Sequence, residues 1–122
     1  NAAFAKTLAQ KTGAIIAITG AIDIVADAER AFAIGNGSPI MGKITGAGCM
    51  LTCVTAAYAV ANPDDMLTGI VAAIAGMGVA GEIAAARMQP VDGNASFRTY
   101  LIDALYNLNG DALKAVARVE EA

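Results

Sequence analysis

Ala14-Ile15-Ile16-Ala17-Ile18-Thr19 is the segment that indicates the fold class most clearly. It is a continuous apolar run that stands between Gly13 and Gly20. An unbroken run of this length predicts a β-strand that is covered on both faces. Such strands belong to sheets with helices packed on them, so the run predicts an α/β fold.

The segments on either side of this strand extend the same pattern. Ala2 to Thr12 predicts a helix that ends at the glycine after it. Ile22 to Ala26 and Ala31 to Ile34 predict two short strands, joined by the polar turn Asp27-Ala28-Glu29-Arg30. We expect Ile40 to Thr45 to be extended. The first third of the chain is therefore expected to supply most of the strands.

From residue 47 onward the pattern becomes helical. A helix is expected from Ala47 to about Ala61, and the next one continues to about Arg87, with Asn62 as its cap and Pro63 in its first turn. Ser96 is expected to cap a helix through Leu108. One face of that helix carries Phe97, Leu101, Leu105 and Leu108. A last helix is expected from Gly110 to Val119.

The helix that ends near Arg87 contains several glycines: Gly69, Gly76, Gly78 and Gly81. Each glycine inside a helix costs up to about 1 kcal/mol relative to alanine. Several in one helix indicate close packing against another backbone, or a break near Gly76 to Gly78. The structural explanation is favoured over direct contact with a ligand.

The composition excludes several classes of protein. The chain has 122 residues, of which 57% are hydrophobic and 16% charged, with a net charge of −3 and no histidine. High hydrophobicity excludes disorder, and the negative charge excludes a basic nucleic-acid footprint. The lack of histidine excludes Ser/His/Asp or Cys/His catalysis and histidine-ligated metals. A chain this short buries a limited share of its surface, so such an apolar composition indicates contact with a membrane or with partner protein.

Partner protein explains the apolar composition better than a membrane does. No charge interrupts the chain from Ile44 to Pro63, and none from Met66 to Gly81. The first stretch is long enough to span a bilayer, but it is poor in Leu, Ile and Phe. No basic cluster flanks either stretch. We therefore expect contact with protein and none with a membrane.

Thr45-Gly46-Ala47-Gly48-Cys49 lies where the extended segment becomes a helix. The backbone N–H groups of such a loop can converge on an anion, and the helix dipole reinforces the attraction. Cys49 falls in the first turn of the helix, where a thiolate is favoured. A single Gly-x-Gly also occurs by chance, and Cys49 and Cys53 can be ordinary packing residues. Free cysteines of this kind fit a reducing compartment.

Several segments together resemble the hydroxyethylthiazole kinase family. The residues that carry the resemblance are, in chain order, Ala17-Ile18-Thr19-Gly20-Ala21-Ile22-Asp23, Asn36-Gly37, Lys43 through Leu51, Gly78-Val79-Ala80-Gly81-Glu82, Ser96-Phe97-Arg98 and Leu101 through Tyr106. The resemblance covers nearly the whole chain but only the C-terminal half of the family, whose members are roughly twice this length.

The resemblance implies a ribokinase-like α/β fold, with residues 1–122 as the C-terminal part of a single kinase domain. It implies ATP-dependent phosphorylation of the hydroxyl of 4-methyl-5-(2-hydroxyethyl)thiazole in thiamine biosynthesis or salvage, with Mg²⁺ required. It also implies a cytoplasmic homotrimer in which this segment works with the N-terminal half of the same enzyme. The composition and the resemblance together predict neither a nucleic-acid nor a membrane partner.

The same resemblance assigns roles to individual residues. Thr19 would contact ATP, and Gly46 would contact the thiazole substrate. The backbone of Gly46, Ala47, Gly48 and Cys49 would form the anion hole for the phosphate in transfer. Most ribokinase-like enzymes have an aspartate base at the position of Cys49, whereas thiazole kinases have a cysteine there, and this chain matches the thiazole kinases. No metal ligand is implied in this half. Asp27-Ala28 and Gly42 depart from the commoner family residues, at positions that carry none of these roles.

Two other functions stay open. A related ribokinase-like kinase would act on hydroxymethylpyrimidine or another small molecule, and an aspartate at position 49 would have favoured it. A non-catalytic fragment would bind nucleotide or hold an oligomer but would need its N-terminal half for turnover. We expect the chain by itself to be inactive and poorly soluble.

Overall fold

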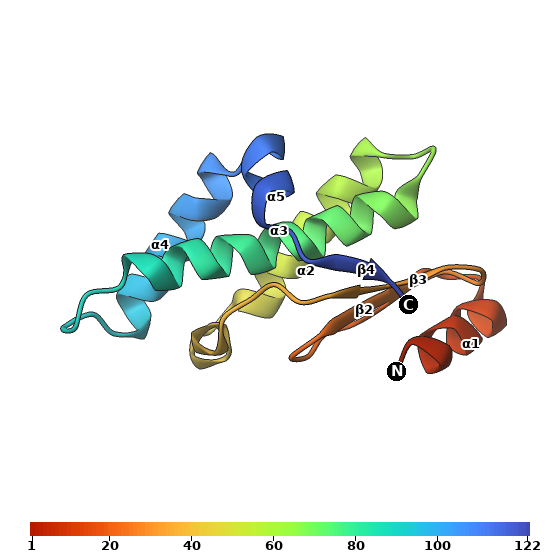
Figure 1. The fold of residues 1–122 in the computed structure, drawn as a ribbon, viewed down its shortest axis with the longest axis horizontal. Coiled ribbons are helices and arrows are strands. Elements are labelled where there is room, and N and C mark those ends of the chain that lie inside the picture. The colour runs from red at the N-terminus through yellow and green to blue at the C-terminus, as the bar shows by residue number, and fades with distance from the viewer.

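The computed structural model describes all 122 residues, and it has the α/β fold that the sequence predicts (Figure 1). Four short strands form one sheet, and five α-helices and one 3-10 helix complete the chain. The elements are α1 (Ala2–Thr12), β1 (Ile16–Ile18), β2 (Asp23–Ala26), β3 (Ala31–Ile34), η1 (Pro39–Lys43), α2 (Ala47–Ala61), α3 (Met66–Arg87), α4 (Asn94–Asn107), α5 (Gly110–Val116) and β4 (Val119–Glu121).

The sheet is antiparallel throughout, in the order β1-β2-β3-β4. The predicted hairpin of β2 and β3 is confirmed, with Val25 opposite Phe32. Asp27 closes its turn, because its Oδ1 accepts hydrogen bonds from the N–H groups of Glu29 at 2.8 Å and Arg30 at 2.6 Å. The C-terminal strand β4 adds to the edge of β3, with Val119 opposite Ile34.

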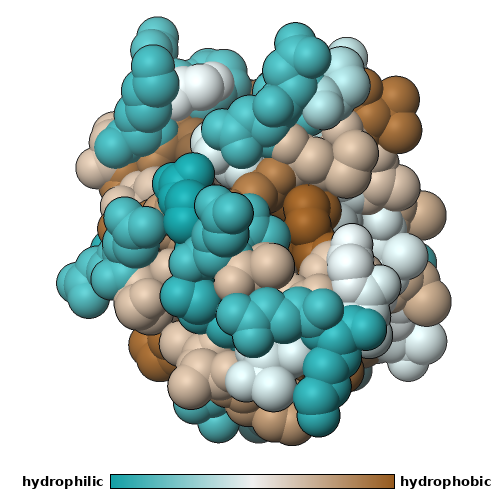
Figure 2. All heavy atoms as spheres, turned by 90° about the vertical axis from the view of Figure 1, so that its right-hand side faces the viewer, coloured by the Kyte–Doolittle hydropathy of each residue, from teal (hydrophilic) through white to brown (hydrophobic).

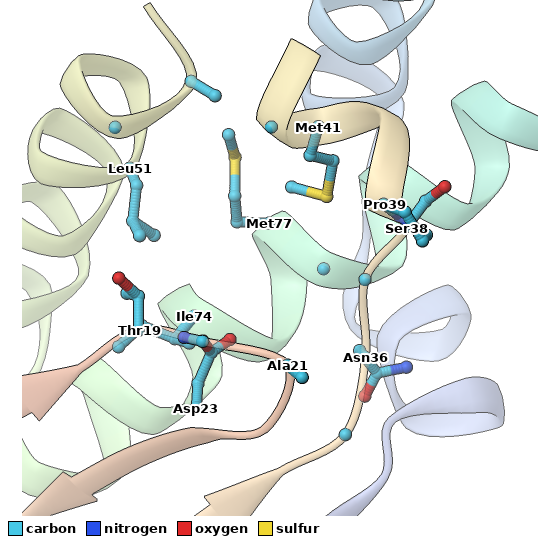
Figure 3. Close-up of a pocket in the computed structure, with 17 residues that line it drawn as sticks. Thr19, Ala21, Asp23, Asn36, Ser38, Pro39, Met41, Leu51, Ile74 and Met77 are labelled. Atoms are coloured by element: carbon cyan, nitrogen blue, oxygen red, sulfur yellow. The ribbon is translucent and has the colours of Figure 1, made fainter. Parts of the chain in front are cut away.

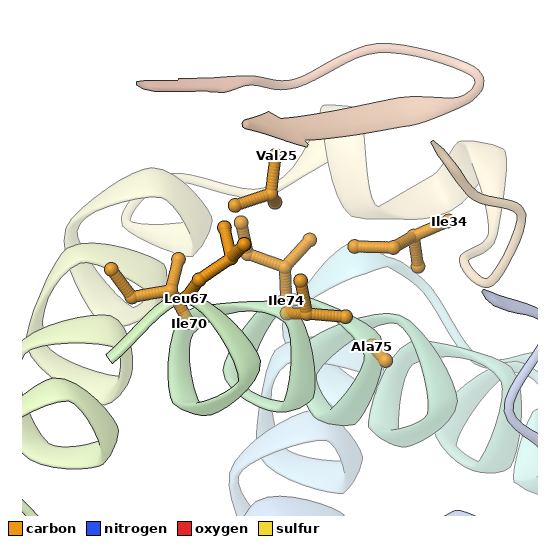
Figure 4. Close-up of a cluster of buried hydrophobic side chains, with 7 residues drawn as sticks. Val25, Ile34, Leu67, Ile70, Ile74 and Ala75 are labelled. Carbon is orange, nitrogen blue, oxygen red and sulfur yellow. The ribbon is translucent and has the colours of Figure 1, made fainter. Parts of the chain in front are cut away.

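Helices cover the two faces of the sheet, and the alternation along β2 divides its side chains between them. Ile24 and Ala26 are buried with Ala5 of α1 on one face. Val25, between them in sequence, is buried on the other face against α3. Figure 4 shows Val25 and Ile34 of the sheet above the apolar side chains of α3. The main core therefore lies between the sheet and α3.

The long helix α3 is the central element, with α2 and α4 packed along it (Figure 1). It is unbroken, so the alternative of a break near its glycines is wrong. Close packing is confirmed instead. A Cβ at Gly69 would lie 3.0 Å from the carbonyl oxygen of Tyr58, and one at Gly78 would lie 2.7 Å from the backbone of Asn36. These glycines let neighbouring segments approach the helix closely.

Two expectations for the strand region are corrected. The run Ala14 to Thr19 does form a strand, but only over Ile16–Ile18, and Ala17 is exposed. The strand lies at the sheet edge, so only the face toward α1 is covered. Ile40 to Thr45 is not extended. Proline sets the backbone dihedral for a helical first turn, and η1 begins at Pro39 with the N–H of Met41 bonded to the Ser38 carbonyl.

Helix boundaries differ from the prediction at three places. Asp65, not Asn62, caps α3: it accepts from the N–H of Thr68 at 3.2 Å. Helix α4 begins at Asn94 after Gly93, so Ser96 lies inside the helix and does not cap it. The last helix ends at Val116, and the residues after it form β4. A charged three-residue strand has no apolar alternation by which to detect it.

Apolar surface remains outside the core. Helix α3 is long and apolar enough to cross a membrane by length and composition, but 67% of its most apolar window is buried inside the fold. It is therefore the core helix of this fold. Helix α2 carries no charge and has no buried residue. The end of the molecule with α1 and the hairpin turn mixes hydrophilic and hydrophobic residues (Figure 2).

Candidate functional site

A cavity of about 590 Å³ opens where the β1–β2 turn, the loop after β3, the start of α2 and the middle of α3 meet (Figure 3). Both apolar and polar groups line it. Its lining residues are Thr19, Gly20, Ala21, Asp23, Gly35, Asn36, Gly37, Ser38, Pro39, Met41, Gly42, Ala47, Gly48, Leu51, Ile74, Met77 and Gly78.

The cavity wall has an apolar side and a polar side. Leu51, Met77 and Met41 lie along one side, and Thr19 and Asp23 lie across from Leu51 in the same view (Figure 3). Burial raises the pKa of Asp23, although the N–H of Gly20, which donates to its Oδ1 at 2.9 Å, lowers it in part. Such a wall suits a ligand with a flat apolar part and a polar part.

The segment Thr45 to Cys49, called the glycine loop below, forms one edge of the cavity through Ala47 and Gly48. Gly46 precedes α2 with φ of 95°, a left-handed backbone conformation that favours glycine. No side chain caps α2. The first N–H groups of a helix have no partner within it, so the start of α2 presents free donors and a positive dipole end. Asn94 of α4 braces the residues before the loop by donating to the Lys43 carbonyl at 3.0 Å.

The structure brings together some of the site residues that the sequence predicts. Thr19, Ala47 and Gly48 line the cavity, although Thr19 lies 28 positions earlier in the chain than Ala47. Gly46 and Cys49 belong to the same loop but are not part of the cavity wall. Cys49 is exposed, as is Cys53 one turn later. The loop therefore has one side in the cavity and another at the surface.

A partly buried polar network behind the cavity was missed by sequence reasoning. Asn36 is only 5% exposed, and its amide donates to Glu82 Oε2 at 3.2 Å. Glu82 also accepts from the N–H of Gly37 at 2.9 Å and pairs with Arg118. One signal could have found it: Glu82 is the only charged residue between Met66 and Ala86. A lone charge in an apolar helix needs a partner.

The network sets the charge of Glu82. Burial by itself would raise the pKa of this carboxyl group. Hydrogen bonds from Arg118, Gly37 and Asn36 outweigh burial, so its pKa lies below the usual range. Glu82 is thus an anion held by neighbours, and it does not face the cavity as a free acid.

The chain offers no metal centre of its own. No group of three or more Cys, Asp or Glu side chains lies close enough to hold a metal ion. Asp23 is the one carboxylate along the cavity wall.

Comparison with known proteins identifies the family. A family model described as the hydroxyethylthiazole kinase family matches residues 1–111. A hydroxyethylthiazole kinase from Clostridium acetobutylicum is 52% identical over 117 residues, which are 96% of this chain and 43% of that protein. One from Methanoculleus marisnigri is 44% identical, again over 96% of this chain and 40% of that protein.

A solved structure agrees with the sequence relatives. The hydroxyethylthiazole kinase protein from Pyrococcus horikoshii matches with a TM-score of 0.82 and 33% identity, over 99% of this chain and 46% of that one. The chain thus spans less than half the length of the relatives that it matches. On these matches, and with the predicted glycine loop at the edge of a cavity, the chain belongs to the hydroxyethylthiazole kinase family.

Proposed function

We propose that the protein containing this chain transfers phosphate from ATP to the hydroxyl of 4-methyl-5-(2-hydroxyethyl)thiazole, in thiamine biosynthesis. One observation carries the proposal: in a chain of this family, an uncapped, glycine-bearing helix start forms the edge of a 590 Å³ cavity with mixed walls. Phosphoryl transfer depends on positioning and on electrostatic stabilisation, which are the properties such a helix start supplies.

The cavity is the proposed nucleotide site. The apolar wall of Leu51, Met77 and Met41 suits the flat base, and Thr19 offers a hydroxyl to the polar part of ATP. Ala47 and Gly48 lie in the same wall, so the end of the nucleotide that reaches them is its phosphate chain. The N–H groups at this helix start would meet the charge that develops on the phosphate in transfer.

The thiazole alcohol is proposed to bind on the other side of the loop. Gly46 and Cys49 lie outside the nucleotide cavity, and Cys49 is exposed. Gly46 would contact the thiazole. Cys49 would orient the substrate hydroxyl and, as the thiolate, take its proton late in the transfer, when the oxygen has become acidic, so that the thiol forms. The loop would then separate acceptor from donor, with the phosphate crossing at the N–H groups.

The remaining parts of the enzyme lie outside these 122 residues in this proposal. This chain's own side chains do not fit a Mg²⁺ site, so the ion would come bound to the nucleotide phosphates and to the N-terminal half. The exposed, uncharged surface of α2 supports contact with that half or with other subunits of a homotrimer. A cytoplasmic location agrees with two unpaired cysteines.

Parallel assays with two alternative alcohols test the proposal. The full-length protein is given ATP and Mg²⁺ with either the thiazole alcohol or hydroxymethylpyrimidine, and ADP release is measured. We expect turnover with the thiazole and little with the pyrimidine. Preference for the pyrimidine would identify the related kinase, and no ADP release with either would leave a non-catalytic protein.

A further inference from the structure

Glu82 lies where three distant segments of the chain meet. It belongs to α3, its Oε1 accepts from the N–H of Gly37 at 2.9 Å, and its Oε2 accepts from the Asn36 amide at 3.2 Å. Arg118, just before β4, forms an ion pair with it. The Glu82 side chain is 27% exposed, so its main partners are protein groups. One carboxylate therefore joins the loop after β3 to both α3 and the C-terminal segment.

Asn36 is held from every side by this arrangement. Its Nδ2 donates to the Val116 carbonyl at 3.0 Å as well as to Glu82, and its Oδ1 accepts from the N–H of Arg118 at 2.6 Å. The backbone of Asn36 packs against α3 at Gly78, where an added Cβ would lie only 2.7 Å from the carbonyl group of Asn36. These contacts fix the position of Asn36, which is one of the residues that line the cavity.

Arg118 fixes the other end of the loop. Its guanidinium donates to the Gly35 carbonyl at 2.6 Å, and its own carbonyl accepts from the N–H of Gly35 at 2.9 Å. The C-terminal segment thus holds Gly35, Asn36 and Gly37 in place, and these three residues line the cavity. None of these contacts involves the glycine loop or Cys49.

We propose that Glu82 is a positioning residue for the nucleotide: its carboxylate holds the loop of residues 35–38 at the place where that loop completes the wall of the nucleotide cavity. The inference rests on the proposed function, because it takes the cavity to be the ATP site. Glu82 acts through Asn36 and Gly37 and touches no substrate. It affects one substrate only, since the thiazole lies across the glycine loop from this wall.

The charge of Glu82 is essential to this role. A carboxylate accepts hydrogen bonds at both oxygens, and here each oxygen has a donor from the loop. Glutamine has nearly the same shape but presents one oxygen and one NH₂ group. In Glu82→Gln the NH₂ group therefore faces a donor, either Gly37 N–H with Arg118 or the Asn36 amide. One loop contact is lost without removal of side-chain volume.

The test measures the kinetics of the full-length protein carrying Glu82→Gln. We expect KM for ATP to rise about tenfold, as for loss of one hydrogen bond to a charged group, with KM for the thiazole within about twofold of wild type. Direct titration with ATP in the absence of thiazole should give the same loss of affinity. Arg118→Gln, which removes the partner cation, should shift KM for ATP in the same direction.

Asp103→Asn is the matched control. It breaks the Arg87–Asp103 ion pair, which also ties α3 to another element but lies away from the cavity lining. Unchanged ATP affinity in Glu82→Gln, or an equal rise of the KM values for ATP and for the thiazole, would overturn the inference. The proposed function would still stand in that case, provided that the wild-type enzyme phosphorylates the thiazole. If Glu82→Gln does not fold, Arg118→Gln decides by the same criterion. A wild type that neither binds ATP nor turns over would overturn the proposed function and this inference together.

Discussion

In the proposed mechanism, the sulfur atom of Cys49 accepts the proton of the substrate hydroxyl. Replacement of its thiol by the less acidic hydroxyl in Cys49→Ser should lower kcat of the full-length enzyme by about tenfold to a hundredfold, because a positioned base contributes on this order or more. Turnover should persist, since the loop N–H groups remain. Steady-state kinetics measure the change, and Cys53→Ser, an exposed cysteine one turn later, is the control. Equal kcat values for Cys49→Ser and wild type would exclude the base role.

Gly46 is limited by its backbone conformation and not by space, because the nearest atom to an added Cβ is an Arg98 nitrogen at 4.0 Å. Its φ of 95° is strained for any residue with a side chain. In Gly46→Val the loop must therefore shift, and we expect kcat/KM to fall by at least about a hundredfold, comparable with loss of an oxyanion-hole donor. Gly93→Ala is the control, because that glycine also precedes a helix but has ordinary dihedrals and nothing within 4 Å of the added Cβ. Wild-type turnover in Gly46→Val would contradict an anion hole at this loop.

Some cavity residues could be predicted from sequence and others could not. Thr19, Ala47 and Gly48 were identified through family resemblance, and the structure places them in one cavity. The partners of Asn36 could not be predicted, because Glu82 and Arg118 lie 46 and 82 positions away. Which side of the loop Cys49 occupies also follows only from the fold. The spacing of residues along the sequence predicts chemistry within one segment. Hydrogen bonds between distant segments follow only from the folded structure.

At the scale of elements, the loop after β3 makes the closest backbone approach to a glycine of α3. Gly78→Ala would place a Cβ 2.7 Å from backbone atoms of Asn36, which cannot move aside as a side chain can. We expect it to lower the free energy of unfolding by about 1–3 kcal/mol, as overpacking does. In Gly76→Ala the nearest atom is a Leu108 methyl at 3.1 Å, which can shift, and higher helix propensity offsets the contact.

Chemical denaturation of both alanine variants distinguishes these two cases. A Gly78→Ala protein as stable as Gly76→Ala would mean that the loop after β3 is not fixed against α3. That result would also weaken the role given to Glu82, which holds the same loop from the next turn of the helix.

Strong local signals made most elements predictable. The apolar hairpin of β2 and β3 and the cores of α1, α2 and α3 follow from runs and periodicity, and they agree with the structure. The predicted helix boundaries were wrong where two residues could fill the same role. At the start of α3, Asn62 and Asp65 are both possible N-caps, and Asp65 is the one that caps the helix. Asn62 instead donates to the Tyr58 carbonyl at 2.8 Å. The strand β4 forms only because β3 offers an edge, so nothing within its own sequence predicts it.

For the whole molecule, acid should reduce stability. The pKa of Asp27 is lowered by hydrogen bonds from the N–H groups of Arg30 and Glu29, and the pKa of Glu82 is lowered as well. The unfolded chain therefore binds protons more readily, so this stability is present above about pH 4 and lost as pH falls through the folded values. Asp23, with its raised pKa, acts in the opposite direction.

Urea unfolding of the full-length protein at neutral pH and near pH 3.5 measures this dependence, the lower value lying below the ordinary carboxyl pKa values of about 4. We expect a smaller free energy of unfolding in acid. Glu82→Gln should flatten part of the slope, because its side chain does not titrate, and Asp103→Asn should flatten it less. A wild type equally stable at both pH values would contradict the pKa directions.

The exposed apolar surface leads to a further expectation for the chain by itself. Only 25 of 122 residues are buried, and α2 contributes none of them. Expressed alone, the 122-residue chain should associate or precipitate and release no ADP from ATP. Light scattering after size-exclusion chromatography, together with the kinase assay, measures both properties. A soluble, monomeric and active chain would show that these residues form a complete enzyme.

Hydrogen–deuterium exchange on the full-length protein tests most directly the claim that the glycine loop separates two ligand sites. One sample holds a non-hydrolysable ATP analogue, and the other holds the thiazole alcohol. We predict that the analogue slows exchange in residues 35–42, and that the thiazole slows exchange in residues 45–53 while leaving 35–42 unchanged. Unchanged exchange of residues 35–42 with the analogue would contradict a nucleotide site in this cavity.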